Sequence, residues 1–348
     1  KMQDPIELKN NIKKWSKELG FDDIGISGIN IKDDEKHLQN WLDKKFHGSM
    51  NYMMKHGKKR SRAELLVPGT IKVISLKIHY YSRDKMSAKE LIDNDSIGYI
   101  ANYALGKDYH KTIKSKLKIL SSKIKEYSDL KGQSSFVDSA PVLEKAFARN
   151  AGLGWIGKNT NLIDKSNGSW FFLAEIYTDL DLPIDEPSIN HCGTCHECID
   201  VCPTQAIIAP YQLDARKCIS YLTIENKESI PLHMRKSIGN RIFGCDDCQS
   251  FCPWNKFAKS AINPDFKPKS NLLNQPLESL FLWSKKEWDK NTKGTALRRS
   301  GYKGWLRNIA VALGNSKTTP SIKRVLQSRL DGDSEMVREH IVWALKQH

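Results

Sequence analysis

The sequence of 348 residues lacks several features that would point to other classes of protein. It has no run of about 18 uncharged apolar residues, so we expect no membrane-spanning helix. Its first 19 residues are charged and amphipathic without an apolar core, which favours a cytoplasmic protein over a secreted one. No P-loop is present, and the glycines of 152–157 do not lie between a strand and a recognisable helix start. The usual nucleotide-binding signatures are therefore missing.

The composition excludes a chain that is disordered over most of its length. Apolar residues make up 39% and charged residues 27%, enough apolar surface to form a core, and the length fits two or three domains. Lysine and arginine number 55 against 40 aspartates and glutamates, a formal net charge of +15. This excess favours nucleic acid or an anionic membrane surface as a partner, although a soluble basic protein without such a partner fits the charge equally well.

Cysteine is absent from positions 1–191 and from 253 onward, and eight cysteines lie between these limits. A secreted disulfide scaffold would spread its cysteines through a short chain, so this clustering favours metal binding. The first group has the spacing C-x2-C-x2-C-x3-C-P of bacterial ferredoxins, and the second repeats the C-x2-C-x3-C-P half. Cys218 lies apart from both groups and can supply the one ligand that the second group lacks.

These groups predict two [4Fe–4S] clusters that act as electron carriers. In the ferredoxin pattern three cysteines of one run bind one cluster, and the fourth binds the other. The ligands of cluster one are then Cys192, Cys195, Cys198 and Cys252. The ligands of cluster two are Cys202, Cys218, Cys245 and Cys248. The alternative is an all-thiolate zinc site formed by the C-x2-C pairs, which leaves four cysteines and two Cys-Pro endings unexplained.

The first half of the chain alternates helix-like and strand-like segments, which predicts an α/β or α+β domain. We expect helices at 6–19, 34–46 and 107–130, with a further helix from about position 141. We expect strands at 21–29, 70–80, 134–138 and 170–177. A linker at 183–187 leads into the ferredoxin-like segment, and the stretch 263–276 with three prolines forms a second boundary. The predicted domains are 1–187, 188–256 and 257–348.

The last predicted domain contains helices only from about position 280. Segments 305–314 and 337–345 resemble each other at a spacing of about thirty residues, which is typical of HEAT-like paired helices. A plain helical cap is the alternative. Residues 256–348 hold 18 basic and 8 acidic residues, whereas residues 1–255 hold 37 and 32. The positive charge is therefore concentrated in the last quarter.

A basic stretch in this domain is the candidate nucleic-acid contact. Between positions 290 and 307 it has six basic residues and no acidic residue, with glycines, Tyr302 and Trp305 interleaved. Such a stretch suits phosphate contacts and stacking on unpaired bases, whereas the alternative is a solvated face. The residues we expect to contact the nucleic acid are Lys293, Arg298, Arg299, Lys303 and Arg307.

Asp138 is the candidate catalytic acid outside the cysteine segment. It lies at the end of a predicted strand in an apolar neighbourhood, where a carboxyl group favours its neutral form and can donate a proton. The alternative is that Asp138 or Ser139 caps the helix expected near Pro141. His110, beside Tyr109, is either a ligand or acid/base group or a structural histidine.

Several motifs together give a resemblance to a known family. The segments 106–110, 137–139, 152–159, 218–223 and 239–245, combined with the split eight-cysteine pattern and the basic tail, resemble the epoxyqueuosine reductase (QueG) family. The resemblance covers nearly the whole chain. It implies an enzyme that uses cobalamin and two [4Fe–4S] clusters to reduce the epoxide of epoxyqueuosine in the tRNA anticodon loop, the last step of queuosine synthesis. It also implies a cobalamin domain similar to that of reductive dehalogenases.

The resemblance also assigns roles to residues. Asp138 is the expected proton donor. The residues expected to line or adjoin the cobalamin are Arg60, Ala101, Tyr109, His110, Asp138, Lys158, Asn159, Leu162, Leu173 and Ser220. We expect a monomer with tRNA and an external electron donor as partners and no membrane. The alternatives are a cobalamin-dependent reductase of a small molecule, such as an organohalide, and an electron-transfer protein without its own reaction.

Overall fold

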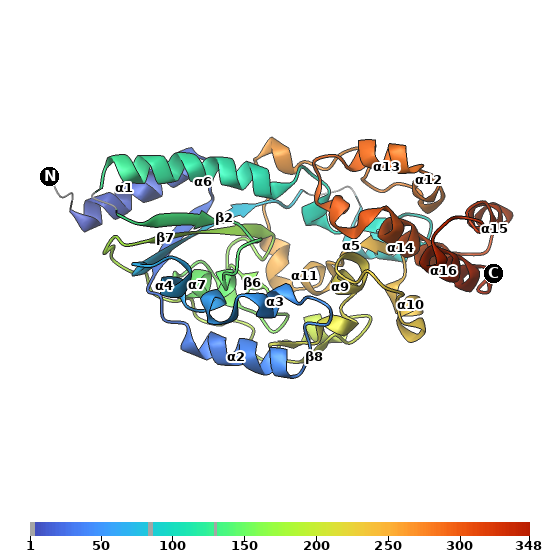
Figure 1. The fold of residues 1–348 in the computed structure, drawn as a ribbon, viewed down its shortest axis with the longest axis horizontal. Helices are drawn as coiled ribbons and strands as arrows, with labels where there is room; N and C mark the ends of the chain where they lie inside the picture. Colours follow the sequence, from blue (N-terminus) through green and yellow to red (C-terminus); the bar gives the residue numbers. More distant parts are fainter. Residues whose placement is uncertain (1–3, 83–85, 129–130) are drawn as a thin grey trace.

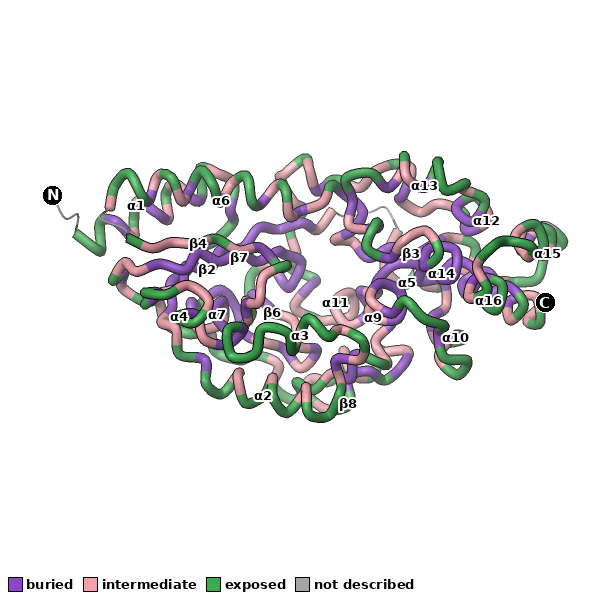
Figure 2. Tube along the Cα trace, in the orientation of Figure 1, coloured by how far each residue is buried: buried purple, intermediate pink, exposed green. Residues whose placement is uncertain are grey.

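The computed structural model describes residues 4–82, 86–128 and 131–348. Its largest sheet has four strands in the order β1-β2-β7-β4, and all neighbouring strands run antiparallel. Their bounds are β1 Asp23–Ser27, β2 Lys72–His79, β7 Phe171–Thr178 and β4 Gln133–Phe136. The central strands β2 and β7 are buried along almost their whole length (Figure 2). Strand β7 is largely apolar, whereas β2 alternates apolar residues with buried polar ones such as Ser75 and Lys77.

Helices cover both faces of this sheet (Figure 1). Helices α1 (Pro5–Glu18) and α6 (Tyr109–Glu126) pack on one face through apolar side chains such as Ile12 and Leu117. Helix α7 (Glu144–Asn150) packs on the opposite face, where Phe147 joins a separate core. Further helices of this region are α2 Lys32–Asp43, α3 Tyr52–Lys55 and α4 Ala63–Leu66.

The predicted helices and strands of this region are confirmed, with shifts of a few residues at their ends. The helix expected at 107–130 is α6, which ends at Glu126, and positions 129–130 lie outside the described residues. The strand expected to end at Asp138 ends at Phe136, and the helix expected near Pro141 begins at Glu144. Asp138 therefore lies in the loop between β4 and α7.

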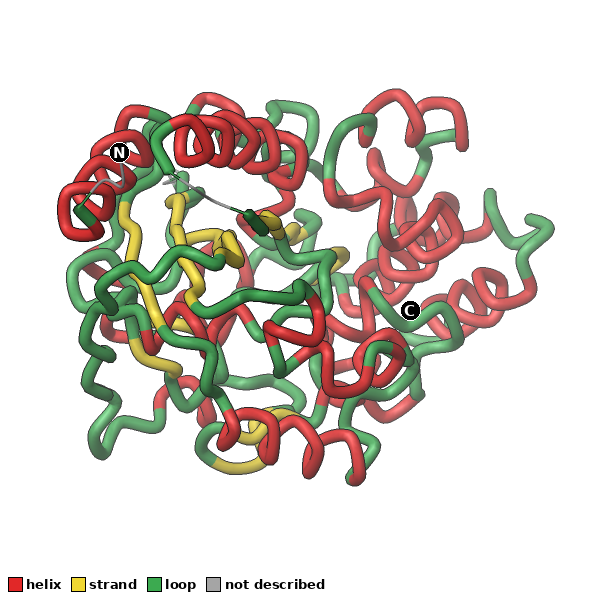
Figure 3. Tube along the Cα trace, turned by 60° about the vertical axis from the view of Figure 1, so that its left-hand side comes forward, coloured by secondary structure: helices red, strands yellow, loops and turns green. Residues whose placement is uncertain are grey.

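The cysteine segment is built from short elements joined by loops. These are α8 Glu197–Asp200, β8 Ile207–Ala209, β9 Gln212–Leu213, α9 Ile219–Ile224, α10 Leu232–Ile238, β10 Arg241–Phe243 and α11 Asp247–Ser250. Two short strands, β5 Trp155–Ile156 and β6 Leu162–Ile163, precede it and pair antiparallel. Figure 3 shows that the strands gather on one side of the molecule and that helices fill the other.

The C-terminal part is helical, as predicted. Its helices are α12 Leu277–Phe281, α13 Lys285–Thr292, α14 Gly301–Asn315, α15 Pro320–Gln327 and α16 Glu335–Leu345. Helix α14 is buried from Gly304 to Gly314 at the centre of this group (Figure 2). The two similar segments are α14 and α16, and they approach so closely that a Cβ on Gly314 would lie 2.5 Å from the Trp343 ring. A HEAT-like repeat stays a prediction.

The packing joins regions that the predicted boundaries separate. Helix α5 (Ala88–Asp93) leads into strand β3 (Tyr99–Ile100), which pairs in parallel with β10 of the cysteine segment. Ile100 and Leu105 lie in the same apolar core as Trp305 of α14. The division at 187 and 256 stays a prediction. In the described part of the chain, no helix has both the length and the apolar character needed to cross a membrane.

Candidate active site

A cavity of about 970 Å³ opens where the sheet region, the cysteine segment and the C-terminal helices meet. Its walls include Tyr103, the start of α6, the loop that holds Asp138, and the start of α9. A second cavity of about 280 Å³ adjoins it, because Tyr103, Tyr109 and Asp138 line both. Cys218, one of the cysteines predicted to bind a cluster, lines the larger of the two cavities.

Asp138 is held at the junction of the two cavities. The Tyr109 hydroxyl donates a hydrogen bond to Asp138 Oδ2, and His110 Nε2 lies 3.6 Å from the same oxygen. The backbone of Asp138 is left-handed, with a φ of 47°, a conformation that costs energy for a residue other than glycine. The side chain is 54% exposed and faces the open cavity. Leu143 is the residue that precedes α7, so Asp138 is not its N-cap.

The sequence around α6 explains where Tyr109 and His110 lie. The Asp108 side chain accepts the backbone N–H of His110 and so caps the helix, and His110 Nδ1 lies 2.8 Å from the same carboxylate oxygen. The Tyr109 ring stacks on Phe172 of β7 at 4.0 Å between ring centroids. Burial, and then the charge of Asp138, raises the pKa of Tyr109 far above its usual value. Its hydroxyl is therefore a constant hydrogen-bond donor to Asp138.

The basic residues predicted to contact nucleic acid fall into two groups. Lys293, Arg298 and Arg299 line the large cavity, and Arg299 pairs with Glu225 at 2.5 Å. Lys303 is exposed on the first turn of α14. These four residues surround the mouth of the cavity or lie on the helix beside it.

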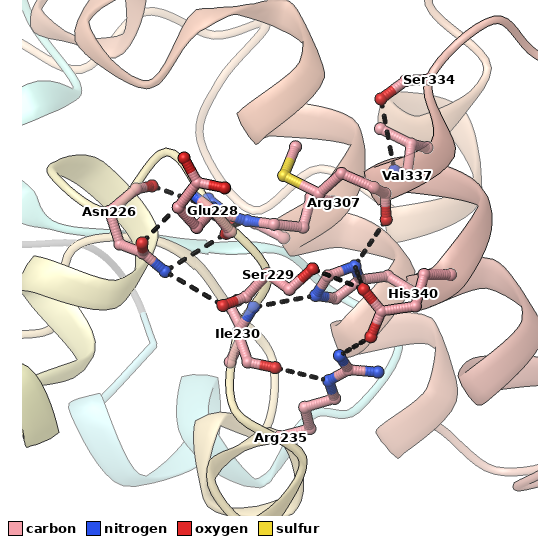
Figure 4. A network of polar contacts seen from close by, with 12 residues as sticks. Asn226, Glu228, Ser229, Ile230, Arg235, Arg307, Ser334, Val337 and His340 are labelled. Carbon is pink, nitrogen blue, oxygen red and sulfur yellow. Dashed lines mark hydrogen bonds and ion pairs between the residues drawn. The ribbon is translucent and has the colours of Figure 1, made fainter.

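Arg307 is placed differently from the prediction. It is fully buried, and its guanidinium donates to the backbone carbonyls of Leu222, Asn226 and Glu228 at 2.8, 2.8 and 2.6 Å. Figure 4 shows Arg307 directed into the loop that carries Asn226 and Glu228. A side chain in this position cannot reach a phosphate, so the structure removes Arg307 from the predicted contact set. Its role is to hold α14 against the cysteine segment.

The structure brings together the four cysteines predicted for cluster one. Cys192, Cys195, Cys198 and Cys252 line one cavity of about 300 Å³, and all eight cysteines are free of disulfides. Trp155 Nε1 donates to Cys192 Sγ at 3.4 Å.

The cysteines predicted for cluster two are partly buried, like those predicted for cluster one. Burial, and then the charges of Cys218, Asp246 and Cys202, raise the pKa of the Cys248 thiol well above its usual value. Cys245 is partly buried, and its thiol donates to Asp247 Oδ1 at 3.1 Å. Cys218 is the member of this set that lines the large cavity.

Seven of the ten residues expected at the cobalamin line one of the two cavities: Arg60, Tyr109, His110, Asp138, Leu162, Leu173 and Ser220. The other three lie elsewhere. Lys158 Nζ donates to the carbonyls of Gly193 and Cys195 at 2.7 Å each. Asn159 donates to the Cys248 carbonyl at 3.0 Å. Both therefore support the cysteine loops. Ala101 is buried, and it leaves no room for a Cβ on Gly244.

Sequence reasoning missed several residues that line these cavities, namely Tyr52, Tyr103, Glu144 and Glu225. Each is a single aromatic or acidic residue, and the sequence has no second residue at a spacing that would mark the two as parts of one motif. Only the fold brings them to the same place. Tyr103 and Glu144 do lie near the motifs around Tyr109 and Asp138, but that proximity carries no chemical signal by itself.

Paired sets of cysteines beside a cavity that holds a carboxylic acid define an iron–sulfur oxidoreductase. Residues 191–255 match the family model described as a 4Fe-4S double cluster binding domain, which supports the two predicted clusters. Residues 60–139 match the model described as epoxyqueuosine reductase QueG, DUF1730. The chain belongs to the epoxyqueuosine reductase family, because relatives with that name are up to 52% identical over its full length.

The relatives and solved structures agree on this family. The epoxyqueuosine reductase of Xanthomonas campestris is 52% identical, covering 99% of this chain and 97% of the relative. The epoxyqueuosine reductase of Pseudomonas aeruginosa is 51% identical, and the match covers 99% of this chain and 96% of the relative. A solved structure of the Bacillus subtilis epoxyqueuosine reductase has its catalytic aspartate loop swung out of the active site. It matches with a TM-score of 0.89 and 28% identity, covering 99% of this chain and 91% of that chain. An epoxyqueuosine reductase with a tRNA-Tyr epoxyqueuosine-modified tRNA stem loop has a TM-score of 0.84 and 26% identity, covering 99% of each chain.

Proposed function

We propose that this enzyme reduces the epoxide of epoxyqueuosine in the tRNA anticodon loop to the alkene of queuosine. The observation that carries the proposal is the position of Asp138, which faces a large cavity with Cys218 on one wall and arginines at its mouth. The family supports the reaction, and a relative of the same fold has a modified stem loop in its structure. A carboxylic acid, an electron path and a basic rim are the parts that this reaction requires.

Cobalamin is part of this proposal. The two adjoining cavities have flat aromatic walls, and Arg60 reaches them with a buried Nε that has no hydrogen-bond partner among the described residues. A large ligand with polar groups at its edge fits such a site, and the seven lining residues named above would hold it. When bound, cobalamin supplies a reduced cobalt centre able to break a C–O bond, chemistry that no amino-acid side chain provides. The proposed domain of 1–187 is then similar in role to that of reductive dehalogenases.

The chain's own residues supply a proton and hold its donor in place. Reduction of an epoxide to an alkene and water consumes two electrons and two protons. The clusters carry one electron at a time from an external donor toward the cavity. The Asp138 carboxyl delivers a proton to the departing oxygen, while Tyr109 and His110 fix its orientation by their contacts with Oδ2.

The basic rim is proposed to hold the tRNA. Lys293, Arg298, Arg299 and Lys303 would contact phosphates and direct the modified base into the cavity, since single-stranded loops can present an unstacked base. The helical domain of 257–348 would thus be the main RNA-binding part, next to the ferredoxin-like domain of 188–256. We propose that the enzyme works as a monomer in the cytoplasm.

The test uses the full chain with both clusters and cobalamin reconstituted without oxygen. A chemical reductant and a stem-loop that carries epoxyqueuosine are added, and the RNA is digested and examined by mass spectrometry. We expect the loss of one oxygen from the modified nucleoside, dependent on cobalamin. An unchanged nucleoside with fully reduced clusters would contradict the proposal and favour the small-molecule reductase or the electron-transfer protein.

A further inference from the structure

A stretch of the sheet region is as basic as the C-terminal stretch that is proposed to hold the tRNA. Positions 44–63 contain seven lysines and arginines and no aspartate or glutamate, and positions 290–307 contain six basic residues and no acidic one. Residues 1–255 as a whole hold 37 basic and 32 acidic residues, so their near balance conceals this local excess. The basic stretch 44–63 has no role in the reaction as described so far.

Part of this stretch forms one wall of the large cavity. It is named here the α3 edge and comprises residues 50–60, with α3 (Tyr52–Lys55) and the 3₁₀ turn Gly57–Arg60. The side chains of the α3 edge that line the cavity are Met50, Tyr52, His56 and Arg60. The lysines that alternate with them along the chain, Lys55, Lys58 and Lys59, are exposed. These lysines therefore lie beside the opening of the cavity.

The positive charge of the α3 edge is not neutralised by the protein. Lys55, Lys58 and Lys59 form no ion pair in the described part of the chain. Glu35, the acidic residue that is affected by the charge of Lys58, is already paired with Arg62 at 2.9 Å. Three exposed lysines within five positions repel one another, and an anionic partner relieves that repulsion.

The backbone of the α3 edge is fixed by contacts with the rest of the active site. The buried Arg60 guanidinium donates to the Tyr52 carbonyl at 2.8 Å. The Tyr221 hydroxyl of α9 accepts the backbone N–H of Ser49 at 2.9 Å. Gly48 has a φ of 58°, and a Cβ there would lie 2.5 Å from the same hydroxyl. The lysines therefore extend from a backbone that is already ordered, which lowers the entropy cost of binding.

The α3 edge meets the basic residues of the C-terminal part at the same opening. Tyr52 and Arg299 both line the large cavity, and the Arg299 guanidinium lies 5.8 Å from the centroid of the Tyr52 ring. One basic surface belongs to the sheet region and the other to the C-terminal part. Positive charge thus reaches the opening from two separate parts of the fold.

We propose that the α3 edge is a second RNA-binding surface, on which Lys55, Lys58 and Lys59 contact phosphates of the stem-loop. The inference rests on the proposed function, because it requires a stem-loop seated at the opening. A stem-loop carries phosphates on two strands, with the unpaired loop between them. The C-terminal basic residues contact one strand and the α3 edge contacts the other, so the loop is centred over the cavity.

The first test removes the three charges in one variant, Lys55→Gln with Lys58→Gln and Lys59→Gln, in the full chain with both clusters and cobalamin. Fluorescence anisotropy with a labelled stem-loop is measured at several salt concentrations. We expect the slope of log affinity against log salt to decrease by about 2 to 3, and the affinity at physiological salt to fall about 10- to 100-fold. Replacing the same lysines by arginine keeps the charges and should preserve both values.

The matched control is Lys14→Gln with Lys118→Gln and Lys125→Gln. These lysines are exposed on α1 and α6 and have the same total charge change, and Figure 1 shows both helices at the end of the molecule away from the C-terminal helices. The control should bind the stem-loop like the wild-type enzyme. Equal cluster absorption and equal circular dichroism show that each variant is folded.

The second test locates the contacts on the RNA by hydroxyl-radical footprinting of the bound stem-loop. The variant of the α3 edge should lose protection on one strand, whereas Arg298→Glu with Lys303→Glu should lose protection on the other. An unchanged salt slope, an equal loss in the Lys14, Lys118 and Lys125 control, or loss of the same protected nucleotides in both sets would each overturn the proposal. If the wild-type enzyme left the epoxide intact, the proposed function would fail, while the footprint would still show whether the α3 edge contacts RNA.

Discussion

One carboxyl group at the junction of two cavities is the point on which the chemistry depends. Asp138 receives the Tyr109 hydroxyl and faces His110, and its strained backbone directs it at the open cavity. The Asp138→Asn variant keeps the shape of the side chain but has no acidic proton. We expect it to lose at least about 100-fold in kcat, the usual contribution of a general acid. Conversion of the stem-loop under anaerobic conditions measures this loss.

The control for this variant is its cofactor content. Visible spectra should show the same cluster absorption and the same bound cobalamin as in the wild-type enzyme. If turnover stayed near the wild-type rate, Asp138 would not be the proton donor.

Arg307 shows why burial decides the role of a basic residue. Its guanidinium donates hydrogen bonds to three backbone carbonyls of the segment 222–228. Burial lowers the pKa of Arg307 only to about 10, so the side chain remains charged at neutral pH. Arg307→Met leaves these carbonyls without a donor in the core. We expect a loss of about 2–4 kcal/mol in the free energy of unfolding. Urea unfolding followed by circular dichroism measures it.

Lys303→Met is the matched comparison, because Lys303 lies on the same helix but is exposed. It should change the free energy of unfolding by less than about 0.5 kcal/mol. Equal stability of the two variants would mean that the contacts of Arg307 do not hold α14 in place.

The sequence predicts residues whose chemistry is local and misses those whose role depends on tertiary packing. The cysteines are identified because their spacing is itself the geometry of a cluster loop, and Cys192, Cys195, Cys198 and Cys252 do line one cavity. Arg307 belongs to the same basic stretch as Lys303. The two differ only in the direction that each faces on α14, since Lys303 is exposed and Arg307 is buried. Glu144 and Glu225 line the cavities but give no signal in the sequence, since a single glutamate has no partner at a regular spacing.

At the scale of elements, one histidine joins the last helix to the cysteine segment. His340 of α16 is fully buried, accepts the backbone N–H of Ile230 at 3.1 Å, and donates to the Met336 carbonyl at 2.7 Å (Figure 4). The contact with Ile230 requires the neutral ring, because a protonated ring has no nitrogen that can accept a hydrogen bond. Burial is the main cause that lowers the pKa of His340 to about 4.

This histidine should make the protein less stable in acid. The unfolded histidine takes up a proton near pH 6.5, whereas the folded one stays neutral down to about pH 4, so its contribution to stability is complete above pH 6.5 and declines as the pH falls between these values. In His340→Gln this part of the pH dependence should be absent, a difference of about 3 kcal/mol across the window. Urea midpoints at pH 4.5 and 7 for both proteins measure it. Parallel curves would contradict the assignment.

Elements themselves are predicted better than their arrangement. Helices α1 and α6 and strands β2 and β7 follow from apolar periodicity within a short window. The order β1-β2-β7-β4 depends on pairing between strands far apart in the chain, for which a single sequence holds no signal. The short strand β3 is missed for a different reason, because two residues carry no periodicity.

At the scale of the whole molecule, positive charge is concentrated in residues 256–348, of which Lys293, Arg298 and Arg299 line the large cavity. The net charge of +15 counts neutral thiols, and bound clusters with eight thiolates lower it to about +11. Residues 256–348 carry most of the excess. Binding of an anticodon stem-loop should therefore weaken steeply as salt increases.

Lys303→Glu combined with Arg298→Glu should reduce both this affinity and its dependence on salt. Each lost phosphate contact should reduce the slope of log affinity against log salt by about 0.7–0.9. Fluorescence anisotropy with a labelled stem-loop at several salt concentrations measures the slope. Lys14→Glu, exposed on α1 at the far end of the molecule, is the control with the same charge change as each substitution (Figure 1). An unchanged slope in the double variant would place the RNA elsewhere.

The pairing of β3 with β10 has a consequence for how the chain is made. Ile100 and Leu105 leave the ribosome long before their partners Phe243 and Trp305. During synthesis these apolar side chains have no core to join, so the nascent chain is open to aggregation or chaperone capture until the last helices emerge. The same interleaving means that a nascent chain released early would retain the sheet but lack the partners that close the cavity.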